Sequence, residues 1–203
     1  MFVPAVCQLP RPEGTLLTFD DGPHPIYTPK ILAILREKNV KAVFFLIGRH
    51  AKQHPELVKQ IQQEGHTIGN HSMIHRWYYG FLPAWCLTQD VLQFNALISE
   101  ITGKEPTLFR PPYGVTNPPL AKALKCFPRL HVVGWTLRTR DTVIRNPQRI
   151  VQVIRKRAKP GNIILLHDRC AATTEALPKV IDYLRADASL RPVAADFFIL
   201  EKP

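Results

Sequence analysis

Short apolar segments that favour β-strands alternate along this chain with segments that carry helix signals, and this alternation strongly constrains the fold. Strand-like segments cover residues 16–19, 42–47, 67–70, 107–109, 130–137, 162–166 and 197–200,. Strands separated by helices of ten or more residues are typical of βαβ units, whose strands form a parallel sheet. The pattern therefore predicts an α/β fold.

Helix starts are marked by a capping residue followed by proline. Thr28 with Pro29, and Asn146 with Pro147, both precede an apolar pattern of helical period,. Further helices are expected over residues 54–65, 91–101 and 177–184,.

About seven such units in 203 residues favour a distorted, incomplete (β/α) barrel, because a complete eightfold barrel usually needs nearer 250 residues. An open doubly wound sheet is the alternative. We expect a single catalytic domain over residues 1–203, with its motif-bearing core at about 15–201.

The composition is strongly basic, with 27 Lys and Arg against 16 Asp and Glu, a net charge of +11. This excess is compatible with binding to nucleic acid or to an anionic surface. No apolar run approaches the roughly 18 residues of a transmembrane helix. The four cysteines are widely spaced without a C-x-x-C pair, so we expect free, buried thiols rather than a disulfide framework.

The chemistry-bearing residues follow the expected strands, where parallel α/β folds place their functional loops. The first strand ends in Asp20 and Asp21. Adjacent carboxylates repel each other unless a cation compensates them. Because strand neighbours point to opposite sides, one could bind a metal while the other stays free as a base. The alternative is a turn with two solvated aspartates.

The third strand leads into His71 and His75. This spacing places both imidazoles on one face if the segment forms a helical turn. Two histidines and one aspartate with an open position are typical of a catalytic metal site, whereas a chance pair on a surface turn is the alternative. The histidines at 50, 54, 66 and 131 are assigned no role.

Three later strand ends carry further polar groups. The fourth leads into Arg110, whose guanidinium can pair with a carboxylate, and prolines fix the backbone before Tyr113,. The fifth leads into Asp141. The sixth ends in His167, which an aspartate such as the adjacent Asp168 can tune as a proton donor near neutral pH,.

In this order the motifs TFDDGP, HSxxH, RPPYG, Asp141 and LxHD resemble those of the polysaccharide deacetylase family, carbohydrate esterase family four. The resemblance spans residues 16–200 and implies a distorted, incomplete (β/α) barrel. It also implies a metal-dependent hydrolase that removes N-acetyl groups from an N-acetylhexosamine glycan, such as chitin oligomers or peptidoglycan.

The resemblance implies a role for each matching residue. Asp20 is the expected general base and His167 the general acid. Arg110 orients Asp20, Asp141 tunes His167, and the Tyr113 N–H stabilises the oxyanion. The expected ligands of one divalent ion, zinc with cobalt or nickel as alternatives, are Asp21, His71 and His75. The acetyl pocket is expected to include Leu165.

One position departs from the family pattern. Many members have tryptophan after the aspartate of the fourth motif, whereas Thr142 follows Asp141 here. Trp135 is a candidate substitute in the pocket, with core packing as its alternative role. The departure leaves the acyl group open, so an O-acetyl esterase, a deformylase and a cyclic-amide hydrolase remain alternatives.

A catalytically silent basic module for nucleic acid or an anionic surface is the remote alternative. It is supported by the basic residues between Arg138 and Lys159, but no nucleic-acid-binding module is recognisable. We expect a glycan substrate, no nucleic-acid partner and a basic surface that attracts an anionic envelope. Residues 1–12 lack a signal-peptide pattern, and cytoplasmic and extracytoplasmic locations stay open.

Overall fold

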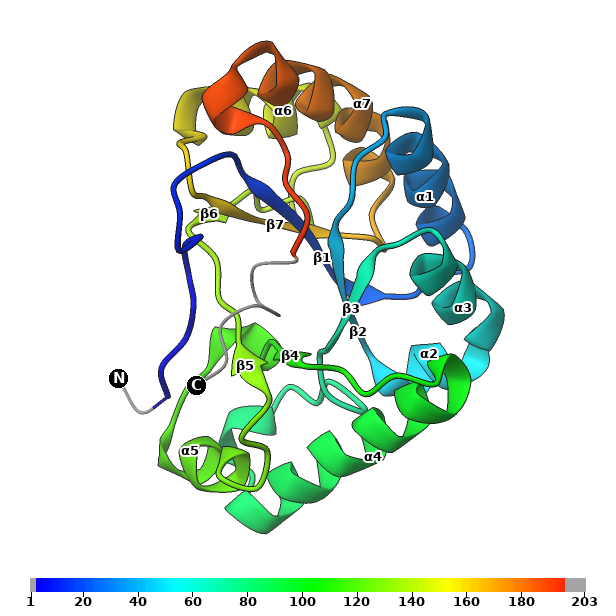
Figure 1. Cartoon of the computed structure of the whole chain (residues 1–203), viewed down its shortest axis with the longest axis vertical. Coiled ribbons are helices and arrows are strands. Elements are labelled where there is room, and N and C mark those ends of the chain that lie inside the picture. Colours follow the sequence, from blue (N-terminus) through cyan, green and yellow to red (C-terminus); the bar gives the residue numbers. More distant parts are fainter. Residues whose placement is uncertain (1–2, 196–203) are drawn as a thin grey trace.

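The computed structural model describes residues 3–195 and has one sheet of seven parallel strands (Figure 1). The strands are β1 (Leu16–Gly22), β2 (Val43–Leu46), β3 (Thr67–Asn70), β4 (Leu108–Phe109), β5 (His131–Val132), β6 (Leu137–Arg138) and β7 (Ile163–His167). Their order across the sheet is β5-β4-β3-β2-β1-β7-β6. The sheet curls while its helices stay on the outside, so the expected distorted, incomplete barrel is confirmed and the doubly wound alternative is wrong.

Seven α-helices cover the described strands. They are α1 (Tyr27–Glu37), α2 (Gly48–Gln53), α3 (Pro55–Gln63), α4 (Ala84–Thr102), α5 (Pro118–Leu124), α6 (Pro147–Arg157) and α7 (Ala171–Ala186). Three short 3₁₀ turns lie at Tyr79–Phe81, Pro112–Gly114 and Ala188–Leu190. No helix among the described residues has the length and apolar composition needed to cross a bilayer.

Most of the predicted strands are present. One predicted segment forms two strands, and another lies outside the described residues. The expected strand over residues 130–137 is two short strands, β5 and β6, because Gly134 and its neighbours turn the chain between them to opposite edges of the sheet. The expected strand at residues 197–200 lies outside the described residues.

Two helix starts show how local signals succeed and fail. Asn146 caps α6 as predicted, since its side chain accepts a hydrogen bond from the Gln148 N–H at 2.9 Å. Thr28 does not cap α1, which begins at Tyr27. Its hydroxyl instead donates to buried Asp168 Oδ2 at 2.5 Å. A long-range partner therefore outcompetes the local cap.

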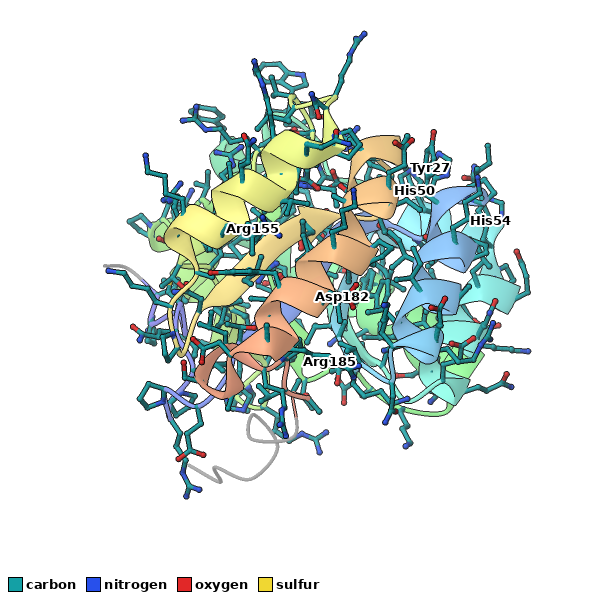
Figure 2. The ribbon with its side chains drawn as sticks, turned by 90° about the horizontal axis from the view of Figure 1, so that it is seen from above. Tyr27, His50, His54, Arg155, Asp182 and Arg185 are labelled. Carbon is teal, nitrogen blue, oxygen red and sulfur yellow. The ribbon has the colours of Figure 1, made fainter. Side chains whose placement is uncertain are left out.

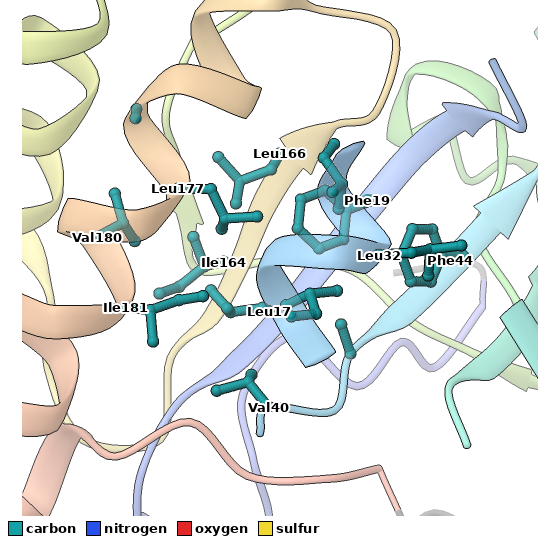
Figure 3. Packing of buried hydrophobic residues seen from close by; sticks show 14 of the residues in the cluster. Leu17, Phe19, Leu32, Val40, Phe44, Ile164, Leu166, Leu177, Val180 and Ile181 are labelled. Atoms are coloured by element: carbon teal, nitrogen blue, oxygen red, sulfur yellow. The ribbon is translucent and has the colours of Figure 1, made fainter. Parts of the chain in front are cut away.

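The apolar core has two faces because side chains of each strand alternate. Leu17 and Phe19 of β1 pack outward against α1 and α7 in the largest cluster (Figure 3). Leu16 points to the other face, into a smaller cluster inside the curled sheet. The same alternation sends Thr18 and Asp20 toward the barrel interior, where polar groups replace the apolar filling.

The amino-terminal segment lies across the open side of the barrel. Val6 bridges to Val133 in parallel, and its N–H donates to Val132 O at 2.8 Å. Leu9 donates to Gly161 O at 2.9 Å and packs into the interior cluster. The four cysteines are free as predicted, but none is buried: three are half-buried and Cys126 is exposed.

Candidate active site

A cavity of about 530 Å³ opens at the carboxyl ends of the strands. Six of the predicted site residues line it together with the two candidate pocket residues Leu165 and Trp135: Asp20, Asp21, His71, His75, Tyr113 and His167. Arg110 and Asp141 are buried beside it. Segments separated by up to about 150 residues therefore meet at one place, as the sequence predicts.

Asp20 is fixed by the interior of the barrel. Buried Arg110 donates from Nη1 to Asp20 Oδ1 at 2.7 Å and to Thr18 Oγ1 at 2.8 Å. Its other nitrogens donate to the carbonyls of Val133 and Gly134 at 3.1 and 2.7 Å. The Phe45 ring lies 4.1 Å from the guanidinium carbon. Four of the five N–H groups of Arg110 are thus hydrogen-bonded, and Arg110 holds Asp20 in one orientation, with Oδ2 left toward the cavity,.

Asp21 reaches the same cavity although it neighbours Asp20. Its φ is 77° and the pairing of β1 with β2 shifts register between Asp20 and Gly22. This bulge turns the Asp21 carboxylate to the cavity side, so the expectation that the two side chains separate to opposite faces is wrong. Both carboxylates consequently serve one site.

The two histidines converge on Asp21. His71 Nε2 and His75 Nε2 each lie 3.6 Å from Asp21 Oδ1. One donor atom from each of the three residues lies within 4.8 Å of the other two. The segment is an irregular turn with positive φ at Ser72 and His75. The helical turn that would place both imidazoles on one face is therefore absent, but the two imidazoles still converge.

The protonation states suit metal binding. His71 Nδ1 donates to the Arg110 carbonyl at 2.6 Å, which leaves Nε2 with its lone pair toward Asp21. Burial, aided by His71, lowers the pKa of His75 to about 4 and so favours the neutral imidazole. Burial disfavours ionised Asp21, but His71, His167 and His75 outweigh it and lower the pKa of its carboxyl. Two imidazole nitrogens and a carboxylate are donor types that fit a first-row divalent ion.

His167 has the environment of a proton donor. Its Nδ1 lies 2.9 Å from Asp141 Oδ1, and its backbone N–H donates to Asp141 Oδ2 at 2.7 Å. The Thr173 hydroxyl donates to Oδ2 at 2.6 Å. Burial opposes the imidazolium, yet the hydrogen bond and charge of Asp141 raise the pKa of His167. Asp141 therefore favours the protonated ring and orients Nε2 toward the cavity.

Asp168 does not support His167, contrary to what its adjacency indicates. It is fully buried, accepts from Thr28, and its Oδ1 has no hydrogen-bond partner among the described residues. Burial raises the pKa of Asp168 to about 7. A Cβ on Gly22 would overlap its Oδ2. Asp168 thus anchors the turn after β1, and the carboxylate that contacts His167 within residues 3–195 is that of Asp141.

Sequence reasoning missed two groups in the site. Arg169 Nε donates to Asp21 Oδ2 at 2.7 Å, which orients the other oxygen toward the histidines. His50 Nδ1 lies 2.9 Å from the Asp21 carbonyl oxygen. Arg169 directly follows the His167-Asp168 motif, so its position at a strand end was the available signal. Nothing in the sequence around His50 indicates its contact.

The remaining predicted residues shape the cavity wall. Leu165 is buried and lines the cavity, and Trp135 lines it while packing against the interior cluster, so both of its proposed roles are compatible with its position. Tyr113 has a φ of 60°, and its ring lies 4.8 Å from that of His75. Thr142 also lines the cavity.

A model of the polysaccharide deacetylase family matches residues 10–128. A peptidoglycan-N-acetylglucosamine deacetylase of Bacillus cereus is 39% identical over 88% of this chain and 85% of that protein. A chitooligosaccharide deacetylase of a Bradyrhizobium strain is 37% identical over 77% of this chain and 71% of that protein.

Another relative is considerably longer. The peptidoglycan-N-acetylglucosamine deacetylase PgdA of Listeria monocytogenes is 34% identical over 91% of this chain, which spans only 38% of its length. Among solved structures, a peptidoglycan N-acetylglucosamine deacetylase superposes with a TM-score of 0.88 at 30% identity. That match covers 96% of this chain and 92% of the other.

Proposed function

The chain belongs to the polysaccharide deacetylase family and is a carbohydrate deacetylase, and from that premise we propose that it removes N-linked acetyl groups from an N-acetylhexosamine glycan in a metal-dependent reaction. Relatives named for peptidoglycan and for chitooligosaccharides support this substrate class. The observation that carries the proposal is the convergence of a candidate base, a candidate acid and three metal-ligand side chains on one cavity.

We assign one divalent ion, zinc with cobalt or nickel as alternatives, to Asp21, His71 and His75. The burial, protonation and spacing of these three side chains support the assignment. When bound, such an ion polarises an acyl oxygen and lowers the pKa of water from 15.7 towards about 7. Arg169 and the Arg110 carbonyl act through hydrogen bonds that orient two of the ligands,.

Asp20 acts as the general base. Arg110 occupies its Oδ1, whereas Oδ2 lies 3.7 Å from His71 Nε2, at the edge of the ligand cluster. A carboxylate held in this way can accept the proton of an attacking water without having to reorient. The oxygen of that water then forms a bond to the acyl carbon.

His167 acts as the general acid. Because Asp141 occupies Nδ1, the proton for the leaving nitrogen comes from Nε2,. The C–N bond breaks as nitrogen receives this proton, which yields acetate and a free amine. The Tyr113 N–H stabilises the negative charge that develops on the acyl oxygen. The left-handed backbone conformation of Tyr113 orients this N–H.

Leu165 and Trp135 bound the space for the acyl methyl group. Their apolar surfaces favour acetyl over a larger polar substituent,. Thr142 leaves one side of this space more open than tryptophan would. O-acetyl ester hydrolysis, deformylation and cyclic-amide hydrolysis are the competing reactions at the same residues.

Product analysis tests the proposal. Zinc-loaded protein is incubated with N-acetylglucosamine oligomers, peptidoglycan fragments, an N-formyl analogue, a cyclic amide and an O-acetylated glycan, and the released acid is quantified beside a chelator-treated sample. We expect acetate together with new free amines from the N-acetyl substrates, and loss of turnover after chelation. Faster cleavage of the ester, formyl or cyclic substrate, or turnover that survives complete metal removal, contradicts the proposal.

A further inference from the structure

A row of exposed aromatic side chains lies between β3 and the start of α4. Trp77, Phe81 and Trp85 are 77%, 86% and 71% exposed, although they lie within nine residues of each other between β3 and α4. Ile74 and Leu92 on either side are also exposed. Each large apolar side chain left in water costs on the order of 2 kcal/mol relative to its burial. Apolar surface concentrated in this way marks an interaction site.

This aromatic row is defined by Trp77, Phe81 and Trp85, and the backbone between its members contacts a loop that borders the catalytic cavity. The Asn117 side chain donates to the Gly80 carbonyl at 2.5 Å, and a Cβ on Gly80 would lie 3.0 Å from Val115 Cγ1. The loop that holds Val115 and Asn117 also holds Tyr113, which lines the cavity. The row and the cavity mouth therefore belong to one face of the molecule.

The row is mainly apolar. Residues 77–85 carry no charge and contain only two hydroxyl groups. That of Tyr79 is buried, and that of Tyr78 is hydrogen-bonded to Arg76. Sites that orient polar ligands need several placed hydrogen-bonding groups, whereas the exposed side chains of the row offer only the indole N–H groups of Trp77 and Trp85,. Exposed tryptophan, tyrosine and phenylalanine are instead typical of the polar–apolar boundary of a lipid bilayer.

The charges of the same face favour an anionic partner. Its acidic groups, at the described strand ends and in the loops that follow them, are all buried: Asp20, Asp21, Asp141 and Asp168. The basic groups of this face are exposed arginines: Arg49, Arg76, Arg138, Arg140, Arg145 and Arg169. Only Arg169 among these six forms an ion pair within the described chain. The face presents positive charge around an apolar row.

We propose that this face docks peripherally onto a lipid bilayer that contains anionic headgroups, with the aromatic row inserted at the headgroup level and the arginines against the lipid phosphates. The cavity mouth then lies at the membrane surface. Insertion would bury the exposed rings, and the arginines would add attraction that depends on salt. The inference concerns binding alone and is independent of the acyl group that the cavity cleaves.

Vesicle sedimentation provides the test. Zinc-loaded protein is mixed with vesicles of phosphatidylcholine alone, or of phosphatidylcholine with about 30% phosphatidylglycerol. We expect binding to the anionic vesicles, weakened by salt, and little binding to the neutral ones. Phe81→Ser and Trp85→Ser should each lower the partition coefficient about tenfold. Phe81→Ser should hydrolyse a short soluble substrate at the wild-type rate, which excludes misfolding.

A matched pair of charge variants separates this face from the rest of the basic surface. Arg76→Glu with Arg145→Glu should weaken binding at least about 25-fold, because each arginine near the surface contributes roughly fivefold. Lys156→Glu with Arg157→Glu changes the net charge equally at the carboxyl end of α6. Helices that follow parallel strands return to the opposite edge of the sheet, so this control should retain binding. Figure 2 shows the same separation along α7, with Arg185 near its far end and Tyr27 and His50 beside its start.

Intrinsic fluorescence gives an independent measure, because two of the three tryptophans lie in the row. Anionic vesicles should shift the emission to shorter wavelength, and brominated lipid should quench it less in Trp77→Ser. The inference is overturned if the protein ignores anionic vesicles, if both charge pairs weaken binding equally, or if the aromatic variants bind as wild type. Binding to insoluble glycan that depends on the same aromatic residues, without vesicle binding, assigns the row to the polymer instead.

Discussion

The two ends of the parallel sheet are built from different chemistry on the same strands. β1 begins with Leu16 and Leu17, which pack on its two faces, and ends with Asp20 and Asp21, which are buried among charged groups. β7 likewise changes from Ile163 and Ile164 to His167. The apolar end supplies the burial that stabilises the fold. At the polar end, holding charged groups out of water lowers that stability.

Backbone geometry shows the same asymmetry. Of the six non-glycine residues with positive φ in the described chain, all but Asn39 lie at or after the carboxyl ends of strands: Asp21, Ser72, His75, Tyr113 and Arg140. Such conformations cost of order 1 kcal/mol or more each and persist where the surroundings fix them. Three of these residues, Asp21, His75 and Tyr113, line the cavity. Substitutions at the two ends should therefore separate activity from stability.

The largest expected effect is on turnover at the polar end. Asp20→Asn removes the proposed proton acceptor but keeps the size of the side chain, so turnover should fall by about 10³-fold. Metal content and thermal stability should stay near those of the wild type. Initial rates with metal analysis of the same sample measure both. Turnover within tenfold of the wild type would exclude Asp20 as the base.

The apolar end should give the converse result. Leu32 of α1 is fully buried in the main cluster, so Leu32→Ala should lower the free energy of unfolding by about 2–5 kcal/mol. The kcat of the folded fraction should be unchanged. Leu92→Ala is the matched control, since Leu92 is exposed, and urea unfolding compares the two. A large loss of kcat in Leu32→Ala would show that substitutions at the two ends do not separate activity from stability.

The third effect concerns acid stability away from the cavity. His66, before β3, is buried, and burial with Lys41 lowers its pKa to about 4. The unfolded chain therefore binds a proton that the folded chain does not, and stability falls as the pH drops from about 6.5 to 4. At pH 5 this single group costs about 2 kcal/mol. His66→Gln should flatten that part of the stability profile, whereas a profile identical to the wild type would assign the loss elsewhere.

The smallest effect tests the contact that the sequence did not reveal. Arg169→Ala removes the hydrogen bond to Asp21 Oδ2 and should weaken zinc binding about tenfold, the lower range for partners of metal ligands. Arg169→Lys should recover part of the affinity. Arg49→Ala is the control, because Arg49 lines the same cavity without a carboxylate contact. Equal zinc affinity in all three variants would show that Arg169 does not position Asp21.

The sequence predicts elements that follow local rules better than elements that are defined by long-range pairing. Strand segments and proline-marked helix starts follow local rules, so β1 to β4, α3 and α6 were located closely. β5 and β6 have two residues each and are defined by pairing with distant strands, which no local pattern encodes. α5 was missed although Asn117 and Pro118 repeat the cap-and-proline signal of α6 and Leu120 and Ala123 follow at helical spacing. The short α2 has no side-chain cap.

The site residues were predictable because their spacing along the chain matched a family pattern, although their geometry was not. The opposite orientation expected for Asp20 and Asp21 ignored the bulge that brings both to the cavity. The adjacency of Asp168 to His167 suggested a pair, whereas Asp141 after β6, which the family resemblance assigns to His167, makes the contact. Contacts of this kind depend on how the sheet curls rather than on which residues are adjacent in the sequence.

Zinc titration against a chromophoric chelator most directly tests the claim that the polar end is a metal centre formed by Asp21, His71 and His75. We expect one ion per wild-type chain, and a loss of affinity of more than about 100-fold in His75→Ala. His54→Ala, a histidine outside the cavity, should bind as the wild type does. Undiminished zinc affinity in His75→Ala, with one ion still bound per chain, would show that these three residues do not form the metal centre.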